Sequence, residues 1–175
     1  MLPSVRVPDE TFECWNPPVR RGVRLGVDVG SVRIGVARSD PDGLLATPLD
    51  TVRRTGDAVE TVSALAVQNS AVEVVVGLAV GLAGREGRAA AEGRAFAGAL
   101  ASRLAPVPVR LVDERFTTVI AHDALRQGGR DSRDRRESVD KAAAALLLQG
   151  ALDAERSTGH PAGELVAAEG TADEH

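Results

Sequence analysis

Hydrophobic and polar residues alternate along the stretch from residue 23 to residue 29. The apolar members are Val23, Leu25, Val27 and Val29, and the positions between them hold Arg24, Gly26 and Asp28. A period of two that is rich in valine is typical of a half-buried strand. Aspartate is disfavoured in strands, and the neighbouring glycine leaves open space beside its carboxylate. The stretch therefore predicts a first strand that carries Asp28 on its polar face.

The residues that follow predict a hairpin. Gly30-Ser31 is a two-residue turn signal, and residues 32–38 then form the returning strand. With this turn, Asp28 faces Arg33 and Gly26 faces Gly35. Two interpretations of Asp28 stay open: a surface aspartate paired with Arg33 across the hairpin, or a functional carboxylate.

The rest of the pattern alternates between strands and helices. The nearly continuous apolar run of residues 72–78 is typical of a buried parallel strand. The other predicted elements are a strand at 46–53, a helix at 57–70, a helix at 88–104, a strand at 107–112, a helix from 117 or 118 to 126, a polar loop at 128–136 and a last helix at 137–156. Three antiparallel strands followed by βα units predict an α/β fold, a mixed five-stranded sheet with helices on its faces.

The patterned segments form one domain with an extension on each side. Residues 1–21 carry prolines, mixed charges and no period, which predicts a flexible N-terminal arm. Residues 157–175 hold four acidic residues and no Lys or Arg, which predicts a disordered acidic tail. The domain between them, 22–156, carries 18 basic and 18 acidic side chains. Its charge is compatible with a surface that contacts phosphates but does not demand one.

The composition of the chain indicates in which cellular compartment the protein is expected. The 175 residues are 43% hydrophobic, and no window approaches the ~18 apolar residues that a membrane span needs. The N-terminus has no apolar run of a secretory signal, and the single cysteine forms no internal disulfide. We therefore expect a cytoplasmic protein without membrane contact. Cys14 is either an idle thiol or the site of an intermolecular disulfide, so both monomer and homodimer stay open.

Three carboxylates stand at the ends of predicted elements. Asp28 lies on the first strand, Glu114 follows the last strand, and Asp140 lies in the first turn of the final helix. Open α/β sheets place their sites at the carboxyl ends of parallel strands. That helix is apolar on every side from Ala142 to Leu148, so a carboxylate on it needs a partner. The alternative for Asp140 is that it complements the helix dipole.

Converging carboxylates suit a hard divalent cation. Mg²⁺ and Mn²⁺ prefer oxygen ligands, and two such ions about 4 Å apart can activate water and stabilise the leaving oxygen of a phosphodiester. Glu137 is either an outer ligand or a solvated surface acid. The residues that other kinds of site require are absent. The chain has no Gly-x-Ser-x-Gly motif of a serine hydrolase and no phosphate-binding glycine loop before its only lysine. It also has too few cysteines and histidines for a structural zinc site.

Arginines supply candidates for phosphate contact. A cluster precedes the final helix and comprises Arg126, Arg130, Arg133, Arg135 and Arg136; Arg33, Arg85 and Arg115 are further candidates at the same edge. The cluster is either a solvated loop or a contact with a nucleic-acid backbone.

Four ordered motifs resemble the YqgF family of bacterial Holliday junction resolvases and pre-16S rRNA nucleases. They are Gly26–Ala37 with Ser39-Asp40, Val76-Gly77-Leu78, Asp113–Thr118 with Ala121, and Val139-Asp140-x-x-Ala143-Ala144 with Leu148-Gln149. The resemblance covers about residues 22–153 and departs from the family's pattern at residues 79–84, where the usual proline and acidic loop are absent.

The resemblance implies an RNase H-like fold and Mg²⁺- or Mn²⁺-dependent hydrolysis of phosphodiesters. It identifies Asp28, Glu114 and Asp140 with the family's acidic trio and adds Thr117 and Thr118 to the nucleic-acid contacts. The implied substrate is a four-way DNA junction or a precursor ribosomal RNA.

Two other functional classes of protein are alternatives to a nuclease. A phosphotransferase of the actin-like superfold also begins with an Asp-x-Gly hairpin, but it needs a second, duplicated domain that 175 residues do not provide. A non-catalytic nucleic-acid or transcription-complex binder that retains the fold is the other alternative. Acids at all three positions argue against it.

Overall fold

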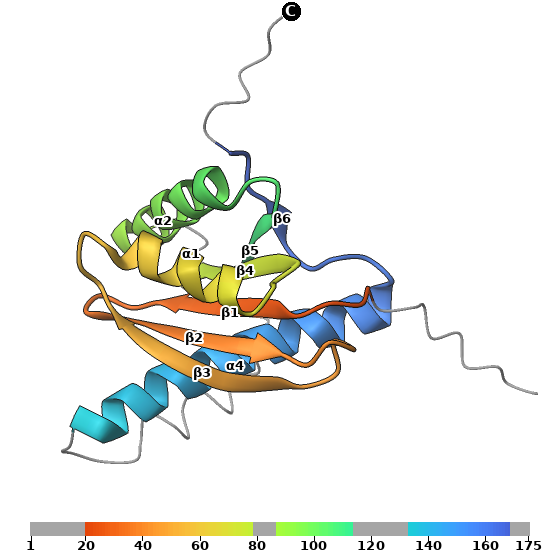
Figure 1. Cartoon of the computed structure of the whole chain (residues 1–175), viewed down its shortest axis with the longest axis horizontal. Helices are drawn as coiled ribbons and strands as arrows, with labels where there is room; N and C mark the ends of the chain where they lie inside the picture. Colours follow the sequence, from red (N-terminus) through yellow and green to blue (C-terminus); the bar gives the residue numbers. More distant parts are fainter. Residues whose placement is uncertain (1–19, 79–86, 114–132, 169–175) are drawn as a thin grey trace, which may run out of the picture.

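The computed structural model describes residues 20–78, 87–113 and 133–168, and for residues 133–138 it describes only the helical backbone (Figure 1). The predicted helix at 117–126 lies outside these residues. None of the helices formed by the described residues is long and apolar enough to cross a membrane.

A six-stranded mixed sheet forms the centre of the fold, in the order β3-β2-β1-β4-β5-β6. The strands are β1 (Arg24–Val29), β2 (Arg33–Ser39), β3 (Ala46–Arg53), β4 (Glu73–Leu78), β5 (Val109–Asp113) and β6 (Glu164–Leu165). β1 to β3 are antiparallel, β4 and β5 run parallel to β1, and β6 is antiparallel to β5. This is the mixed α/β sheet that the sequence predicts, with one additional edge strand.

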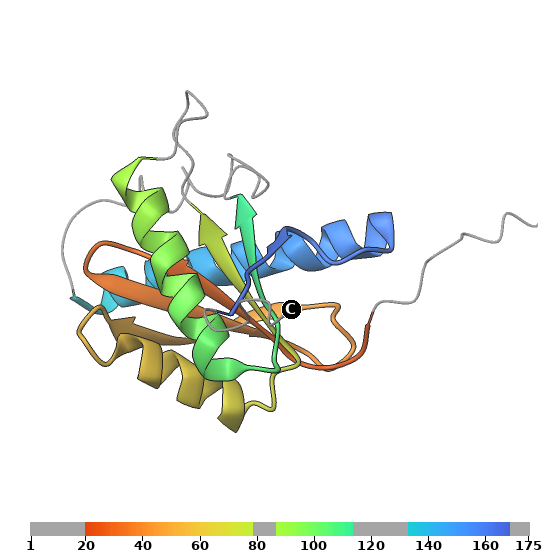
Figure 2. The same cartoon turned by 90° about the horizontal axis from the view of Figure 1, so that it is seen from above.

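Helices cover both faces of the sheet. α1 (Ala58–Gln68) and α2 (Arg88–Leu104) lie on one face, and α4 (Arg133–Thr158) crosses the other (Figure 1 and Figure 2). The alternation of the strands divides the core accordingly: Val27 and Val76 pack on the side of α1 and α2, whereas Val75 and Val112 pack against α4. β4 and β5 therefore contribute to two hydrophobic layers.

Two glycines allow α4 to lie very close to the sheet. A Cβ at Gly26 would stand 2.6 Å from the Cβ of Leu148, and a Cβ at Gly35 would stand 2.0 Å from the carbonyl oxygen of Asp140. Any larger residue at either position would have to displace the helix. The packing of α4 thus explains why Gly26 on β1 and Gly35, opposite Asp28 on β2, carry no side chain.

The β1–β2 register differs from the prediction by two residues. Asp28 lies opposite Gly35, not opposite Arg33, and Val29 lies opposite Ile34. The turn is centred on Ser31 and Val32, and the backbone N–H of Gly30 donates to the carbonyl of Arg33 at 2.9 Å. Neither central residue has a positive φ, so the turn does not use the conformational freedom of Gly30 that the prediction relied on.

Both ends of the domain extend beyond the predicted boundaries. α4 begins at Arg133 and ends at Thr158, so the last part of the predicted polar loop is helical. Residues 157–168 are ordered, which corrects the prediction of a disordered tail from residue 157, because β6 hydrogen-bonds to β5. Arg20 and Arg21, predicted in the flexible arm, form ion pairs with the domain.

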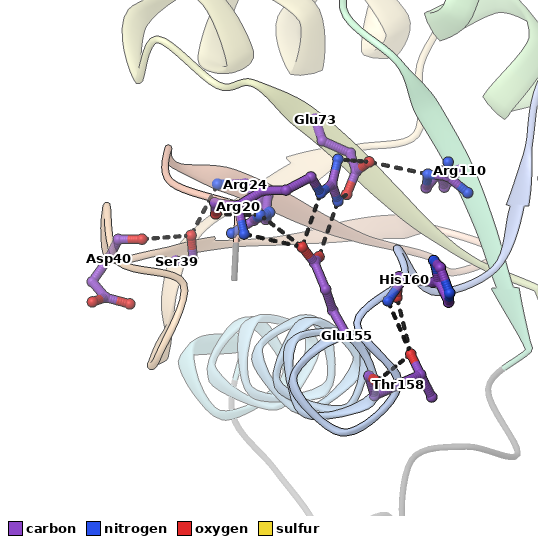
Figure 3. A network of polar contacts seen from close by, with 10 residues as sticks. Arg20, Arg24, Ser39, Asp40, Glu73, Arg110, Glu155, Thr158 and His160 are labelled. Atoms are coloured by element: carbon purple, nitrogen blue, oxygen red, sulfur yellow. Dashed lines mark hydrogen bonds and ion pairs between the residues drawn. The ribbon is translucent and has the colours of Figure 1, made fainter. Parts of the chain in front are cut away.

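A charged network at one end of the sheet ties the C-terminal part of α4 to Arg20, which precedes β1, and to Arg24 at the start of β1 (Figure 3). Glu155 of α4 accepts hydrogen bonds from Arg20 Nε at 2.8 Å and from Arg24 Nη2 at 3.3 Å. Glu73 of β4 accepts from Arg20 Nη2 at 2.9 Å and from Arg110 Nε at 3.0 Å. The Arg24 side chain is only 1% exposed, and Glu155 is its buried counter-charge.

Candidate active site

Asp28 and Asp140 lie on the same face of the sheet. Residues 26 and 28 share a face of β1, and Gly26 lies directly beneath Leu148 of α4. Asp28 is paired with Gly35, and Gly35 touches the backbone of Asp140. Both aspartates are partly buried. The fold thus places the strand aspartate and the helix aspartate on either side of Gly35.

The position of Asp140 in its helix removes one alternative interpretation. α4 begins at Arg133, so Asp140 lies two turns inside the helix and not in its first turn. The interaction of a charge with the helix dipole falls off within the first turn. Complementing the dipole therefore does not explain this aspartate.

Arg33 supplies a positive charge beside the two carboxylates. Its Nη1 lies 4.0 Å from Oδ2 of Asp140, and the two side chains are 20% and 34% exposed. A separation of 4.0 Å is an ion pair without a short hydrogen bond. Arg33 therefore contacts Asp140, and not Asp28 as the predicted register had it.

The β1–β2 turn beside this site is fixed by Arg54. The backbone N–H of Arg54 donates to the carbonyl of Val32 at 3.0 Å, and its Nη1 donates to the carbonyl of Gly30 at 3.2 Å. The same guanidinium pairs with Glu92 of α2 at 2.9 Å. Hydrogen bonds from Arg88 and then Arg54 hold the pKa of the Glu92 carboxyl below its ordinary value. The sequence analysis missed this role of Arg54, because nothing in the local pattern links it to the turn.

The remaining predicted site residues lie outside the described part of the chain. These are Glu114, Arg85, Arg115, Thr117, Thr118, Cys14 and the side chains of Arg133, Arg135 and Arg136. Among the side chains that the structure describes, no three Asp, Glu, His or Cys residues form a group that could hold a metal ion. Val112, two residues before Glu114, packs on the α4 face of the sheet.

The described residues fit a hard divalent cation. The donors on offer are the carboxylate oxygens of Asp28 and Asp140, the ligand type that Mg²⁺ and Mn²⁺ prefer. Gly35 presents no side chain between them, and the backbone of Asp140 is fixed against it. Arg33, with its Nη1 at 4.0 Å from Oδ2 of Asp140, places a positive charge beside these oxygens.

Comparison with known proteins identifies relatives over most of the chain. A protein from Thermobifida fusca, named "Putative pre-16S rRNA nuclease", is 57% identical over 160 residues, covering 87% of this chain and 99% of that protein. A protein of the same name from Nocardioides sp. is 58% identical over 153 residues, covering 85% and 98%. Among solved structures, Thermus thermophilus RuvC gives a TM-score of 0.46 at 17% identity, covering 77% of this chain and 97% of that one.

A family model matches the ordered domain itself. The model is described as RuvX, Holliday junction resolvase, and it spans residues 22–154, which include Asp28 and Asp140. The match includes β1, the glycines Gly26 and Gly35 that lie against α4, and α4 itself up to residue 154. The chain belongs to the RuvX family, the one that its motifs indicate under the name YqgF.

Proposed function

We propose that this protein is a metal-dependent endonuclease that hydrolyses phosphodiester bonds in structured nucleic acid. The observation that carries the proposal is the convergence of Asp28 and Asp140 beside Gly35 on the α4 face of the sheet. Membership of the RuvX family supports the same activity.

Asp28 and Asp140 are the proposed ligands of the metal, with Glu114 as the third. When bound, Mg²⁺ or Mn²⁺ supplies an activated water and stabilises the charge on the leaving oxygen. Asp28 is held by a central strand of the sheet, and Asp140 by a helix that packs on Gly35 and is tied to Arg20 through Glu155, so neither ligand depends on a loop. This rigid placement favours a preorganised site.

Arg33 is the proposed phosphate contact nearest to the carboxylates. Its guanidinium already lies 4.0 Å from Asp140, so a phosphate beside the metal site is within its reach. The further proposed contacts with nucleic acid are Arg85, Arg115, Thr117, Thr118, Arg133, Arg135 and Arg136. Their support is the sequence resemblance and the position of Arg133 at the start of α4.

Precursor 16S ribosomal RNA is the first proposed substrate. Relatives at 57% and 58% identity, matched over 99% and 98% of their lengths, carry the name of a pre-16S rRNA nuclease. A four-way DNA junction is the second, supported by the description of the family as Holliday junction resolvases. With either substrate, the proposed location of the protein is the cytoplasm.

A two-substrate assay tests the proposal. The purified protein is incubated with Mn²⁺ or Mg²⁺ and either a labelled precursor 16S rRNA fragment with its 5′ extension or a synthetic four-way DNA junction. Trimming of the RNA alone supports the first substrate, and paired symmetric nicks in the junction support the second. Tight binding without cleavage of either would contradict the nuclease proposal and favour a non-catalytic binder.

The oligomeric state is a separate proposal. Cutting two strands of a junction symmetrically favours a homodimer, whereas RNA trimming requires only a monomer. The proposed link in such a homodimer is a disulfide between two Cys14 residues, because the single cysteine of this chain can pair only with another molecule. Non-reducing electrophoresis of the wild type beside Cys14→Ser tests it, and a monomer band in both would refute the disulfide.

A further inference from the structure

Arg33 and Arg53 lie directly opposite each other on β2 and β3. Directly opposed residues of antiparallel strands hold their Cβ atoms about 4.5–5.5 Å apart, and like charges there destabilise the sheet. We propose that Arg33 and Arg53 together bind a backbone phosphate of the nucleic-acid substrate and position its strand over the Asp28–Asp140 site. This inference rests on the proposed nuclease function and adds a substrate-binding residue, Arg53, that the sequence analysis did not single out.

The register places this pair next to the carboxylates. Asp28, Gly35 and Thr51 form one row across β1, β2 and β3. Arg33 and Arg53 lie two residues along from Gly35 and Thr51, so they share the face of Asp28 and stand about 7 Å farther along the strands. The ion pair of Arg33 with Asp140 confirms that the Arg33 side chain is on the α4 side.

Arg53 retains its charge for a ligand. Its side chain is exposed, and in the part of the chain that the structure describes it makes no ion pair. The neighbouring Arg54 differs, because its guanidinium is bound to Gly30 and Glu92 and serves the turn. A protein that keeps two opposed arginines at the edge of a carboxylate site accepts a cost in stability, which is typical of a residue kept for binding.

The place is open to a large ligand and is held rigidly. β3 is the edge strand of the sheet, and Val32 at the turn beside the pair is 70% exposed. Arg54 hydrogen-bonds the turn to the end of β3, so Arg33 and Arg53 keep their relative position when a strand docks. Two guanidinium groups held in fixed positions can both donate charge-assisted hydrogen bonds to the oxygens of one phosphate.

Binding and cleavage by Arg53→Gln test the inference. The probes are the labelled precursor rRNA fragment and the four-way DNA junction, bound in Ca²⁺ at several salt concentrations and cleaved in Mn²⁺. We expect Arg53→Gln to weaken binding about fivefold to tenfold. We also expect the slope of log K against log[salt] to become less steep by about 1, the contribution of one phosphate contact. We expect kcat to stay within about twofold while KM rises, because Arg53 holds the strand and not the reacting atoms.

Two further variants separate binding from structure. Arg53→Lys keeps the charge and should recover most of the affinity, whereas Arg38→Gln removes an exposed arginine from the far end of β2 and should leave affinity unchanged. Removing one of two opposed charges should leave the melting temperature of Arg53→Gln equal to or above that of the wild type. A purely structural role would instead lower it.

The outcomes distinguish the inference from the function on which it rests. Wild-type cleavage together with unchanged affinity and unchanged salt dependence in Arg53→Gln would overturn the two-arginine contact alone. Failure of the wild type to bind and cleave either probe would refute the nuclease proposal, and the inference with it.

Discussion

Gly35 lies opposite Asp28 in the sheet, and the carbonyl oxygen of Asp140 stands 2.0 Å from the point where a Cβ of residue 35 would be. The absence of one side chain therefore allows the helix to approach the strand and places the two carboxylates together. The glycine serves the site through packing, without contributing a chemical group of its own.

Replacing Gly35 by alanine should displace α4. The added methyl group cannot share space with the backbone of Asp140, so we expect a loss of about 2–3 kcal/mol in the free energy of unfolding. We also expect loss of most cleavage activity, because Asp140 moves away from Asp28. Urea denaturation and the cleavage assay measure the two effects.

Gly98→Ala is the matched control. Gly98 lies on α2 with no atom within 4 Å of an added Cβ, and alanine is the better helix former. This variant should be as stable as the wild type or more stable, with full activity. Equal stability of Gly35→Ala and the wild type would show that α4 is not seated on Gly35.

Metal binding should stabilise the fold through the two aspartates. A ligand present at 100 times its Kd raises the free energy of unfolding by about 2.7 kcal/mol when it binds only the folded state. We therefore expect Mn²⁺ to raise the melting temperature of the wild type, and to raise that of Asp140→Asn much less. An equal rise in both proteins would place the metal elsewhere.

Glu155 should make stability depend on pH. Burial alone would raise the pKa of its carboxyl, but the hydrogen bond from Arg20 and the charges of Arg24 and Arg20 outweigh burial and hold it below the ordinary value of 4.5. A carboxyl with a lowered pKa in the folded state stabilises above its unfolded pKa, and this contribution is lost as the pH falls through the folded pKa.

Glu155→Gln measures this contribution. At pH 7 we expect a loss of about 3 kcal/mol, the lower end for a broken buried pair, because Arg24 stays buried while Arg20 is 40% exposed. The difference from the wild type should shrink as the pH falls from about 4.5, the ordinary pKa, through the lower pKa of the folded state, where the wild-type carboxyl also becomes neutral. Glu164→Gln, which breaks the exposed pair with Arg94, should cost less than about 1 kcal/mol at any pH. A constant difference for Glu155→Gln across the range would contradict the network's role.

Local patterns predicted much of this fold. α2 begins and ends at the predicted residues, Arg88 and Leu104, and the strand alternation placed Asp28 on the face that α4 covers. The hairpin register was wrong because Gly30-Ser31 is a stronger turn signal than Ser31-Val32, and the choice between them depends on Arg54, a residue outside the hairpin.

Long-range contacts account for the features that the sequence did not reveal. β6 is only two residues long and has no pattern of its own; it exists because β5 offers a free edge. Arg24 and Glu73 are charged residues within apolar strands, and their pairing through Arg20 and Glu155 depends on elements far apart in the chain. Such pairings follow from the packing of the whole domain and not from any local period.

The single-turnover cleavage rate of Asp28→Asn tests the central claim most directly. The wild type, Asp28→Asn, Asp140→Asn and the control Asp42→Asn, whose exposed carboxylate pairs with Arg21, are compared with Mn²⁺ on the substrate that the wild type cleaves. We expect a loss of at least about 100-fold in both site variants, with melting temperatures that show intact folding, and no change in Asp42→Asn. Cleavage by Asp28→Asn at the wild-type rate would show that the site described here is not the catalytic centre.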